Sequence, residues 1–318
     1  GAPVWAVTEG AGLFRSLDGG ASFNNFDVNS GLAASNVRSL AVHPSAIFTA
    51  TTRPIYAGFG DTFYGSSAIW RSVNNGVTWP IANNSLRGSN IRAIVFDDTT
   101  VGAPDQQAAP PGLATSVVYA SGTSARNGVS GQFRNSGIYK SLNGGGTWTM
   151  LDGGMPRTGT PPNDYANIGS TVRSLVLDPR SCASPPAGNA RCGTVLGVTV
   201  GQSPLNTVWA NASGRGALGW RILRSTDGGL NWTSRDNGIP VPSVDGETVT
   251  PIVLAMDAAD SNTLYASTTV NFDYAANPVP TLANGVFKTI DGGANWVPAN
   301  GPAGVTGLPR YPGSTDTA

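Results

Sequence analysis

The chain has 318 residues, and its 19 basic and 19 acidic side chains give a formal net charge of zero. This balance argues against a nucleic-acid partner bound through a broad basic surface, and no apolar run approaches the ~20 residues needed to cross a bilayer. Glycine (42) and proline (23) are abundant while 40% of residues are hydrophobic. That composition predicts many short strands joined by turns around a packed core.

The first predicted elements are two β-rich stretches, residues 4–8 and 13–15, followed by the octapeptide SLDGGASF at 16–23, which we call box 1. The same pattern recurs as boxes 2 to 5 at residues 72–79, 141–148, 225–232 and 289–296. A box has Ser or Thr first, Asp or Asn third, Gly fifth, a small polar residue seventh and an aromatic residue eighth. Because Asp or Asn can bond within its own turn and Gly permits positive φ, each box predicts a hairpin turn. The third residues are Asp18, Asn74, Asn143, Asp227 and Asp291.

The sequence around each box repeats as well. Two apolar residues and a base precede every box, and we expect these bases to lie on solvated flanks. Further upstream come second strands at 4–8, 55–59, 117–122 and 263–268, with 195–200 and 208–213 as alternatives in the fourth unit. Innermost strands are predicted at 37–44, 91–98, 172–179 and 251–258. Each unit is therefore about four strands, with the box between the third and the fourth.

The boxes resemble the Asp-box, or BNR, repeat of sialidases, the sortilin ectodomain, xyloglucanases and photosystem II assembly-factor-like proteins. The resemblance implies an all-β fold, a β-propeller of four-stranded blades with the boxes at the blade periphery, away from the ligand-binding face. We predict one domain, 1–318, with five blades at 305–312 plus 1–26, 37–82, 91–151, 172–235 and 251–299. Residues 305–312 are predicted to close the ring. The alternative is that they complete a neighbouring subunit and give a head-to-tail homo-oligomer.

The loops between second and third strands hold the candidate catalytic residues. Three carboxylates lie there, and aromatic residues beside them suit a sugar site, because rings stack on apolar sugar faces. In the xyloglucanases a catalytic Asp follows a Thr in a first-blade loop, and here Glu9 follows Thr8. The alternative is that these are ordinary solvated loop residues. The catalytic candidates are Glu9, Asp61 and Asp273, and the aromatic candidates for ligand binding are Tyr64, Trp209 and Tyr274.

Three arginines form a second candidate ligand-binding set. Arg38, Arg92 and Arg173 occupy the second position of three consecutive innermost strands. If they point toward one end of the channel, they can hold a carboxylate or a sulfate. Sialidases also use three arginines, but this chain lacks their F/Y-R-I-P motif. The alternative is that the arginines bond to carbonyl groups of adjacent-blade loops.

Few other residues suggest chemistry. No metal-ligand spacing is present, so no metal and no cofactor is expected, and His43 is expected to be a turn residue. Cys182 and Cys192 are predicted to form a disulfide, which fits an extracytoplasmic protein. The chain begins at Gly1 without Met or a visible signal peptide, so a removed leader and a fragment both stay open.

Two functions follow from these features. The preferred hypothesis is a secreted, cell-surface or periplasmic non-catalytic propeller that binds a glycan or a protein, or serves as a self-assembling scaffold. The alternative is a glycoside hydrolase with carboxylate catalysis on the loops opposite the boxes. Neither hypothesis involves nucleic acid or insertion into a membrane.

Overall fold

The structure is a computed structural model that describes residues 3–8, 11–25, 37–43, 53–60, 69–80, 89–97, 117–126, 133–134, 137–151, 170–178, 195–201, 221–239, 248–271 and 285–299. Every regular element in these ranges is a β-strand, which confirms the all-β prediction for the described part of the chain. Within the same ranges, no helix has the length and apolar character that a membrane span requires.

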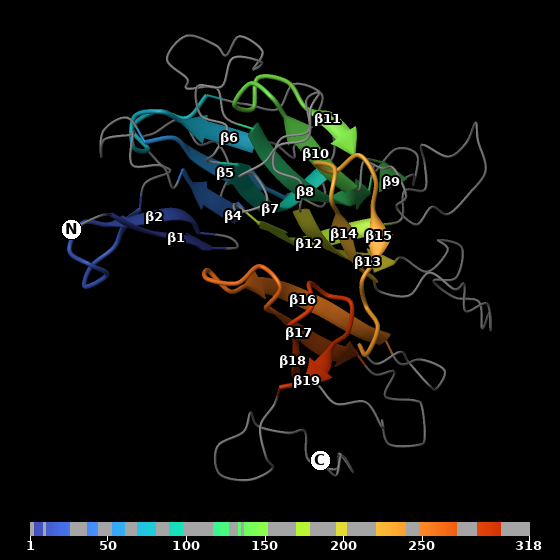
Figure 1. The fold of residues 1–318 in the computed structure, drawn as a ribbon. Coiled ribbons are helices and arrows are strands. Elements are labelled where there is room, and N and C mark those ends of the chain that lie inside the picture. Colours follow the sequence, from blue (N-terminus) through green and yellow to red (C-terminus); the bar gives the residue numbers. More distant parts are fainter. Residues whose placement is uncertain are drawn as a thin grey trace.

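The strands form five antiparallel sheets, which we number I to V in chain order (Figure 1). Sheet I contains β1 (Val4–Thr8), β2 (Gly12–Ser16) and β3 (Asn24–Asn25), and sheet II contains β4 (Val37–Val42), β5 (Ile55–Phe59) and β6 (Ile69–Ser72). Sheet III contains β7 (Ser89–Asp97), β8 (Val117–Arg126), β10 (Gly137–Ser141) and β11 (Thr149–Leu151), and β9 (Phe133–Arg134) pairs with β8. Sheet IV contains β12 (Ser170–Leu177), β13 (Val195–Gly201), β14 (Arg221–Ser225) and β15 (Thr233–Ser234). Sheet V contains β16 (Thr248–Met256), β17 (Leu264–Asn271), β18 (Gly285–Thr289) and β19 (Val297–Pro298).

The sheets follow one another around an arc, with sheet I at one end and sheet V at the other (Figure 1). Their first strands β4, β7, β12 and β16 contact one another in this order, and β1 contacts β4. The predicted innermost, second and third strands are therefore confirmed, and β13 shows that 195–200 is the second strand of the fourth unit. Sheet I begins at a second strand, and residues 305–312, predicted to complete it, lie outside the described part.

Each box forms the same turn after a third strand. In box 3 the Ser141 hydroxyl accepts hydrogen bonds from the backbone N–H of Asn143 (3.3 Å) and Gly145 (2.8 Å), and it donates one to Asn143 Oδ1 (2.9 Å). The same Oδ1 accepts a bond from the backbone N–H of Thr147 at 2.8 Å. Gly145 has a φ of 84°, which L side chains rarely adopt. The other four boxes repeat these bonds, as the pattern predicted.

The third and seventh residues of a box are matched as donor and acceptor. In box 3 the amide Nδ2 of Asn143 donates to Thr147 Oγ1 at 3.0 Å. In box 4 the direction is reversed, because Asn231 Nδ2 donates to Asp227 Oδ2 at 2.8 Å. An amide at the third position is therefore paired with an acceptor, and a carboxylate is paired with a donor.

The bonds within a box keep its carboxylate ionised. Hydrogen bonds from the side chains of Thr289 and Asn295 lower the pKa of Asp291 to about 2. A bond from the Ser16 hydroxyl is the main cause that holds the pKa of Asp18 well below its usual value. Both carboxylates are exposed, and the hydrogen bonds within the box are what lower their pKa values.

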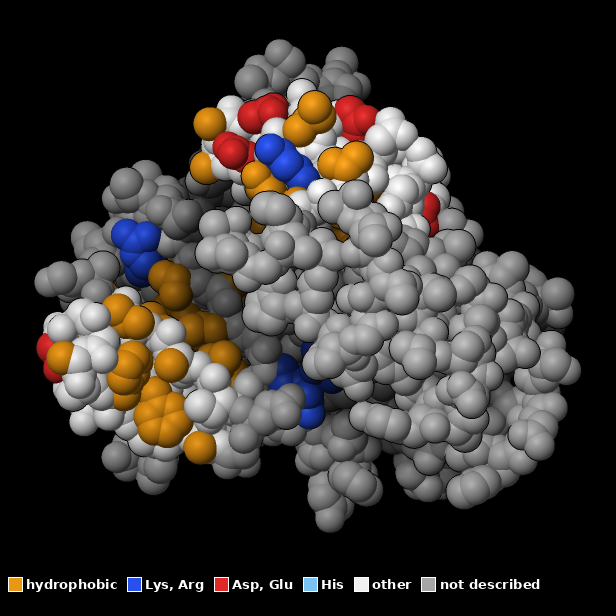
Figure 2. Space-filling model, turned by 90° about the horizontal axis from the view of Figure 1, so that it is seen from below, with side chains coloured by type: hydrophobic (Ala, Val, Ile, Leu, Met, Phe, Trp, Pro, Cys, Tyr) orange, Lys and Arg blue, Asp and Glu red, His pale blue; other side chains and the backbone are white. Residues whose placement is uncertain are grey.

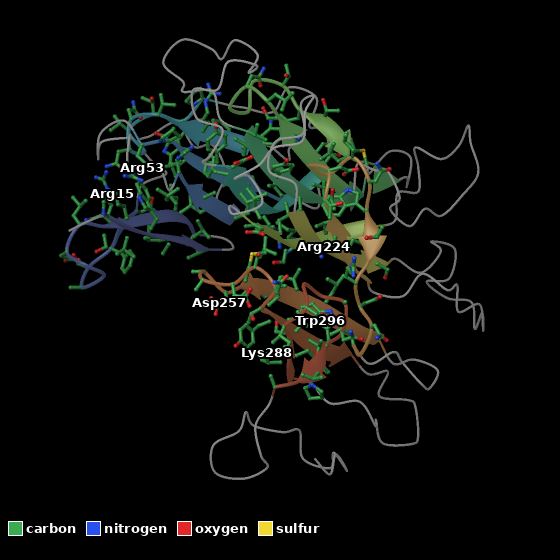
Figure 3. The ribbon with its side chains drawn as sticks, in the orientation of Figure 1. Arg15, Arg53, Arg224, Asp257, Lys288 and Trp296 are labelled. Atoms are coloured by element: carbon green, nitrogen blue, oxygen red, sulfur yellow. The ribbon has the colours of Figure 1, made fainter. Side chains whose placement is uncertain are left out.

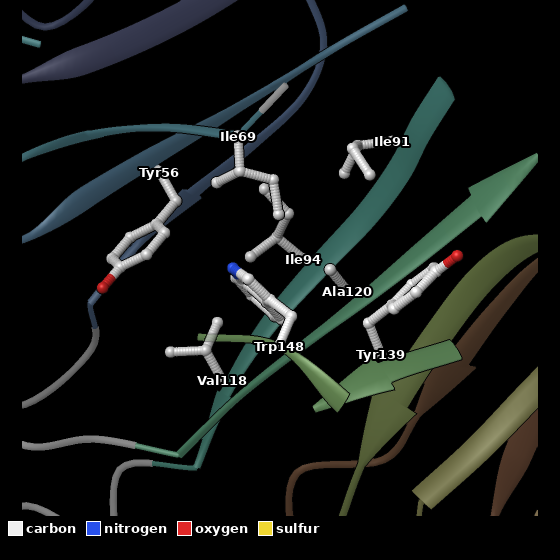
Figure 4. Packing of buried hydrophobic residues seen from close by; sticks show 8 residues of the cluster. All are labelled: Tyr56, Ile69, Ile91, Ile94, Val118, Ala120, Tyr139 and Trp148. Carbon is white, nitrogen blue, oxygen red and sulfur yellow. The ribbon is translucent and has the colours of Figure 1, made fainter. Parts of the chain in front are cut away.

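The hydrophobic core is divided into clusters, each between two neighbouring sheets. Figure 4 shows the cluster between sheets II and III, where Tyr56 and Ile69 pack against Ile94, Val118 and the box 3 tryptophan. The box tryptophans are 3–5% exposed, and each contributes to one of these clusters. Burial of an aromatic ring of this size is a large share of the free energy that holds one sheet to the next.

The basic residue before a box bonds to the following sheet. Our prediction that these bases lie on solvated flanks is therefore wrong for the first four, which are half-buried between sheets. In each case the acceptor is the backbone carbonyl of the fourth residue in the next box. The four bonds are Arg15 Nη1 to Asn75 (3.4 Å), Arg71 Nη1 to Gly144 (2.9 Å), Lys140 Nζ to Gly228 (3.2 Å) and Arg224 Nη1 to Gly292 (3.5 Å).

Candidate ligand-binding end of the sheets

Every sheet has two chemically different ends. Because neighbouring strands are antiparallel, the links between consecutive strands leave alternately at one end and at the other. The boxes link third strands to fourth strands, so they share one end, which we call the box end. The start of each innermost strand and the segments between second and third strands belong to the opposite end, which we call the loop end.

A register shift occurs in all four innermost strands, near the loop end. In each pair of first and second strands, one residue of the first strand is skipped, which marks a β-bulge or a similar irregularity. Bulges redirect a side chain and are common beside functional sites. The skipped residues are Arg38, Arg92, Arg173 and Ile252.

The three arginines proposed from the sequence thus occupy equivalent shifted positions in sheets II, III and IV. Sequence reasoning placed them on one strand position but did not predict the shift. In sheet V the same register shift occurs at Ile252, which is not an arginine. The residue type therefore does not predict where the shift occurs. The signal that could have identified the position is its place as the second residue of each innermost stretch predicted from the sequence, 37–44, 91–98, 172–179 and 251–258.

Hydrogen bonds tie these positions to their surroundings. Arg38 Nε donates to the carbonyl of Gly60 at 3.4 Å, an acceptor in the arginine's own sheet rather than in an adjacent one. The hydroxyl of the next residue, Ser39, is buried and donates to the Ile91 carbonyl in sheet III at 3.0 Å. Since Ile91 immediately precedes Arg92, the shifted positions of sheets II and III lie side by side. Arg92 Nε is buried, and the side chain of Arg173 lies outside what the structure describes.

A corresponding bond joins sheets IV and V. The hydroxyl of Ser174, which follows Arg173, accepts a hydrogen bond from the backbone N–H of Leu254 at 3.1 Å. The loop end is thus held together by polar bonds between sheets as well as by the core. A row of arginines on such a fixed frame suits recognition of carboxylate or sulfate groups, because guanidinium binds them through paired hydrogen bonds.

The candidate carboxylates occupy segments that begin and end at this same end of the sheets. Glu9 lies between β1 and β2, Asp61 between β5 and β6, and Asp273 between β17 and β18. These three residues lie outside the described part of the chain, so their catalytic assignment stays a prediction. The same holds for Tyr64, Trp209 and Tyr274 and for the predicted disulfide between Cys182 and Cys192.

Other groups in the described part do not form a second site. His43 is buried, with its ring 4.6 Å from that of Phe96, and its carbonyl accepts a bond from Arg53 at 2.7 Å. Its packing between sheets II and III accounts for it as a structural residue. No group of three or more His, Cys, Asp or Glu residues within the described ranges could hold a metal ion.

Comparisons with known proteins support the fold and leave the function open. No protein-family model and no curated protein matches the sequence. Among solved structures, the chain is similar to the GH74 xyloglucanase from Xanthomonas campestris, with a TM-score of 0.52 and 13% sequence identity. The match covers 93% of this chain and 50% of the xyloglucanase, so the chain spans about half its length. This likeness supports a β-propeller type of fold.

Two further solved structures match with lower TM-scores. The GH74 enzyme of Niastella koreensis has a TM-score of 0.43 and 17% identity over 93% of this chain and 43% of that one. The GH93 α-L-arabinofuranosidase of Fusarium graminearum, in complex with arabinobiose, has a TM-score of 0.42 and 13% identity over 85% of this chain and 67% of that one.

Proposed function

We propose that the protein is a carbohydrate-acting β-propeller whose ligand site lies at the loop end. The observation that carries this proposal is the position of Arg38, Arg92 and Arg173, each at a register shift at the same end of three consecutive sheets. The segments with the candidate carboxylates begin and end there too. Cationic groups beside carboxylates can bind an acidic glycan and leave acid–base groups near its glycosidic bonds.

Glycoside hydrolysis has better support than the non-catalytic function preferred from the sequence, because the fold resembles that of a xyloglucanase over 93% of the chain. In such a reaction one carboxylic acid protonates the leaving oxygen while a second carboxylate acts as base or nucleophile, and water completes the cleavage. Glu9, Asp61 and Asp273 are the residues proposed for these two roles.

A hydrolysis assay tests this proposal. Release of reducing ends is measured on xyloglucan, arabinan and sulfated or uronic-acid polysaccharides, with the wild type and Glu9→Gln, Asp61→Asn and Asp273→Asn. We expect at least one replacement to abolish turnover while the protein remains folded. Asp18→Asn is the matched control, because box 2 and box 3 naturally hold Asn at this position. Equal activity in all variants would exclude these carboxylates from catalysis.

A non-catalytic glycan-binding module is the second candidate. The arginine positions favour it independently, since guanidinium groups can hold an anionic glycan without any acid–base pair. A glycan array probed with the wild type separates the two functions. Retention of acidic glycans without turnover in the hydrolysis assay would support the binding module. Binding of a protein ligand, or self-assembly as a scaffold, would appear as capture or oligomer formation without glycan retention.

We also propose that the five turns are Asp boxes and that the chain is a single five-bladed domain. The shared hydrogen bonds of the boxes support this assignment. Residues 305–312 are then the innermost strand of the first blade, in the same chain or in a neighbouring copy. Deletion of residues 304–318 tests both versions: we expect a lower melting temperature or a changed oligomer size, and no change in either would exclude them.

An extracellular, cell-surface or periplasmic location fits this proposal, because polysaccharides are found there. A Cys182–Cys192 disulfide fits the same oxidising environment. Mass determination before and after reduction, on protein purified from the native compartment, tests the disulfide. Two free thiols there would remove this support for an extracytoplasmic location.

A further inference from the structure

The Ser39 hydroxyl joins the two strands that carry Arg38 and Arg92. It belongs to a buried side chain and donates to the Ile91 carbonyl at 3.0 Å. Arg38 directly precedes Ser39, and Arg92 directly follows Ile91, so one hydrogen bond connects the chain segments of both arginines. Because both arginines lie at register shifts, this bond fixes the relative position of two irregular segments.

Gly58 brings sheets II and III close together at the same point. It lies opposite Ser39 in the register of β4 and β5. A Cβ added at Gly58 would clash with the Ser39 hydroxyl and with the side chain of Ile91. The glycine therefore leaves the space that the hydroxyl occupies between the sheets. Such a closely packed junction leaves the spacing of the two shifted positions little freedom.

The junction between sheets III and IV is built differently. Ala93 takes the place of Ser39, and a serine, Ser121, stands opposite it on β8. The Ser121 hydroxyl is fully buried and has no hydrogen-bond partner within the described residues. It shares its side of β8 with Tyr119, which packs against sheet IV, so it faces that sheet. The described part of this junction therefore has no serine bond of the kind that links sheets II and III.

The junction between sheets IV and V has a serine bond but lacks a second arginine. The Ser174 hydroxyl accepts a hydrogen bond from the backbone N–H of Leu254 at 3.1 Å. The shifted position of sheet V, however, holds Ile252. Of the three junctions between sheets II and V, the one between sheets II and III thus combines a serine bond with two arginines.

Anion binding at the loop end has to rely on a few well-placed cations. The formal net charge of the chain is zero. On the face that Figure 2 shows, the described Lys and Arg side chains are few and stand apart from one another. Two guanidinium groups that share one small oxyanion must keep their geometry to within about 0.5 Å. Cations that bind separate groups of a flexible glycan tolerate more variation, so a fixed spacing indicates a shared anion.

We propose that Ser39 is a positioning residue that holds Arg38 and Arg92 as a pair on one sulfate or carboxylate group, while Arg173 binds a second anionic group of the same glycan. This inference rests on the proposed ligand site at the loop end and names its substrate class. The ligand is a polyanionic glycan with charged groups on separate sugar units. A glycan with one charged group would occupy the pair and leave Arg173 without a ligand group.

A double-mutant cycle tests the pairing of the arginines. Titration calorimetry gives the Kd of an oligosaccharide with sulfates on two separate sugar units, for the wild type and for single and double Gln variants of Arg38, Arg92 and Arg173. Residues that act on one group have non-additive effects. We expect Arg38→Gln with Arg92→Gln to weaken binding about tenfold less than the product of the single effects. Arg92→Gln with Arg173→Gln should match the product within about twofold.

Replacement of the serine tests the positioning role. Ser39→Ala should reduce the coupling between Arg38 and Arg92 from about tenfold to less than about twofold. Ser174→Ala is the matched control, because its hydroxyl also joins two sheets through one bond. Both replacements should lower the melting temperature, but the control should leave the coupling unchanged. The same coupling in both variants would show that Ser39 contributes to stability alone.

An oligosaccharide with a single sulfate tests the second anionic group. Its Kd should rise when Arg38 or Arg92 is replaced, whereas Arg173→Gln should change it by less than about twofold. With two sulfates, all three replacements should weaken binding. If Arg173→Gln and Arg92→Gln weakened binding of the singly sulfated ligand equally, the three arginines would share one group and the inference would be wrong.

Failure of this inference can be told from failure of the proposed function. If acidic oligosaccharides bind and the effects of Arg38→Gln and Arg92→Gln are additive, the ligand site stands and the pairing is wrong. If no oligosaccharide binds, the cycle is repeated with inorganic sulfate, whose binding is measured as a rise in melting temperature. Coupling on sulfate would support the pairing and contradict the glycan ligand, and an absence of sulfate binding would contradict both.

Discussion

The two ends of the sheets differ in how far they repeat. At the box end, five turns of the same length share the same hydrogen bonds, and each box residue has one structural task. At the loop end, the segments between second and third strands vary from residues 9–11 to residues 202–220. The shifted positions there hold arginine in three sheets and isoleucine in the fourth. The comparison indicates that the box end stabilises the fold, whereas the loop end is free to acquire a ligand site.

The largest expected effect concerns a buried box aromatic. Trp232 is 4% exposed and donates from Nε1 to the Gly229 carbonyl at 2.9 Å. Trp232→Ala should lower the free energy of unfolding by about 3–5 kcal/mol, because it removes a large core side chain and leaves a cavity. Denaturant unfolding measures it. Leu230→Ala, in the same box but 61% exposed, is the control and should change the value by less than ~1 kcal/mol. Equal effects of the two replacements would contradict a buried stabilising role.

A smaller loss is expected from a box hydroxyl. Ser141 is 1% exposed, and its hydroxyl makes three bonds within box 3. Ser141→Ala should cost about 1–3 kcal/mol of unfolding free energy, because two buried backbone N–H groups lose their acceptor. Thr226→Ala, at the exposed second position of box 4, is the control. Glycan binding by the folded Ser141→Ala protein should be unchanged, because Ser141 lies at the box end. A loss of binding in this variant would show that the two ends are not separate in function.

The sequence was informative where a physical constraint repeats. Ser225 and Asp227 predicted a turn because their bonds close within eight residues, and strand order followed from the repeat of apolar stretches. The role of Lys140 was not predictable, since its acceptor, Gly228, lies in another sheet and the local sequence suggests only a solvated base. The register shift at Arg38 was hidden for a similar reason, because it depends on how two strands pair. Long-range pairing of this kind leaves no local pattern in a single sequence.

Acid should affect boxes with Asp more than boxes with Asn. The pKa of Asp291 is about 2 in the folded protein and 3.8 for the free side chain, so the carboxylate binds protons more weakly when folded. Its contribution is therefore present above pH 3.8 and lost as the pH falls toward 2. Asp291→Asn should reduce the drop in melting temperature across this window. The melting temperature of each protein at pH 7 is its reference value. If the melting temperature of Asp291→Asn fell with acid as much as that of the wild type, box 5 would not contribute to acid unfolding.

The smallest effect on stability is expected at the loop end, where the effect on binding should be largest. Arg38 makes a long hydrogen bond, 3.4 Å to Gly60, so Arg38→Gln should change the unfolding free energy by less than ~1 kcal/mol. Binding of a sulfated or carboxylated oligosaccharide should weaken by about ten- to a hundredfold, since one charge-assisted contact is worth roughly 1.5–3 kcal/mol and each 1.4 kcal/mol is a factor of ten. Titration calorimetry measures the change, and a neutral oligosaccharide should be unaffected.

The matched control for Arg38 is Arg53, an arginine of the same sheet at the box end. Arg53 donates to the His43 carbonyl at 2.7 Å, just before β5 begins (Figure 3). Arg53→Gln removes the same charge from the protein, so it would weaken binding equally if net charge alone attracted the anion. We expect acidic oligosaccharides to bind this variant as they bind the wild type. A position-dependent loss, at Arg38 and not at Arg53, would place the anion at the loop end and separate the two ends by function.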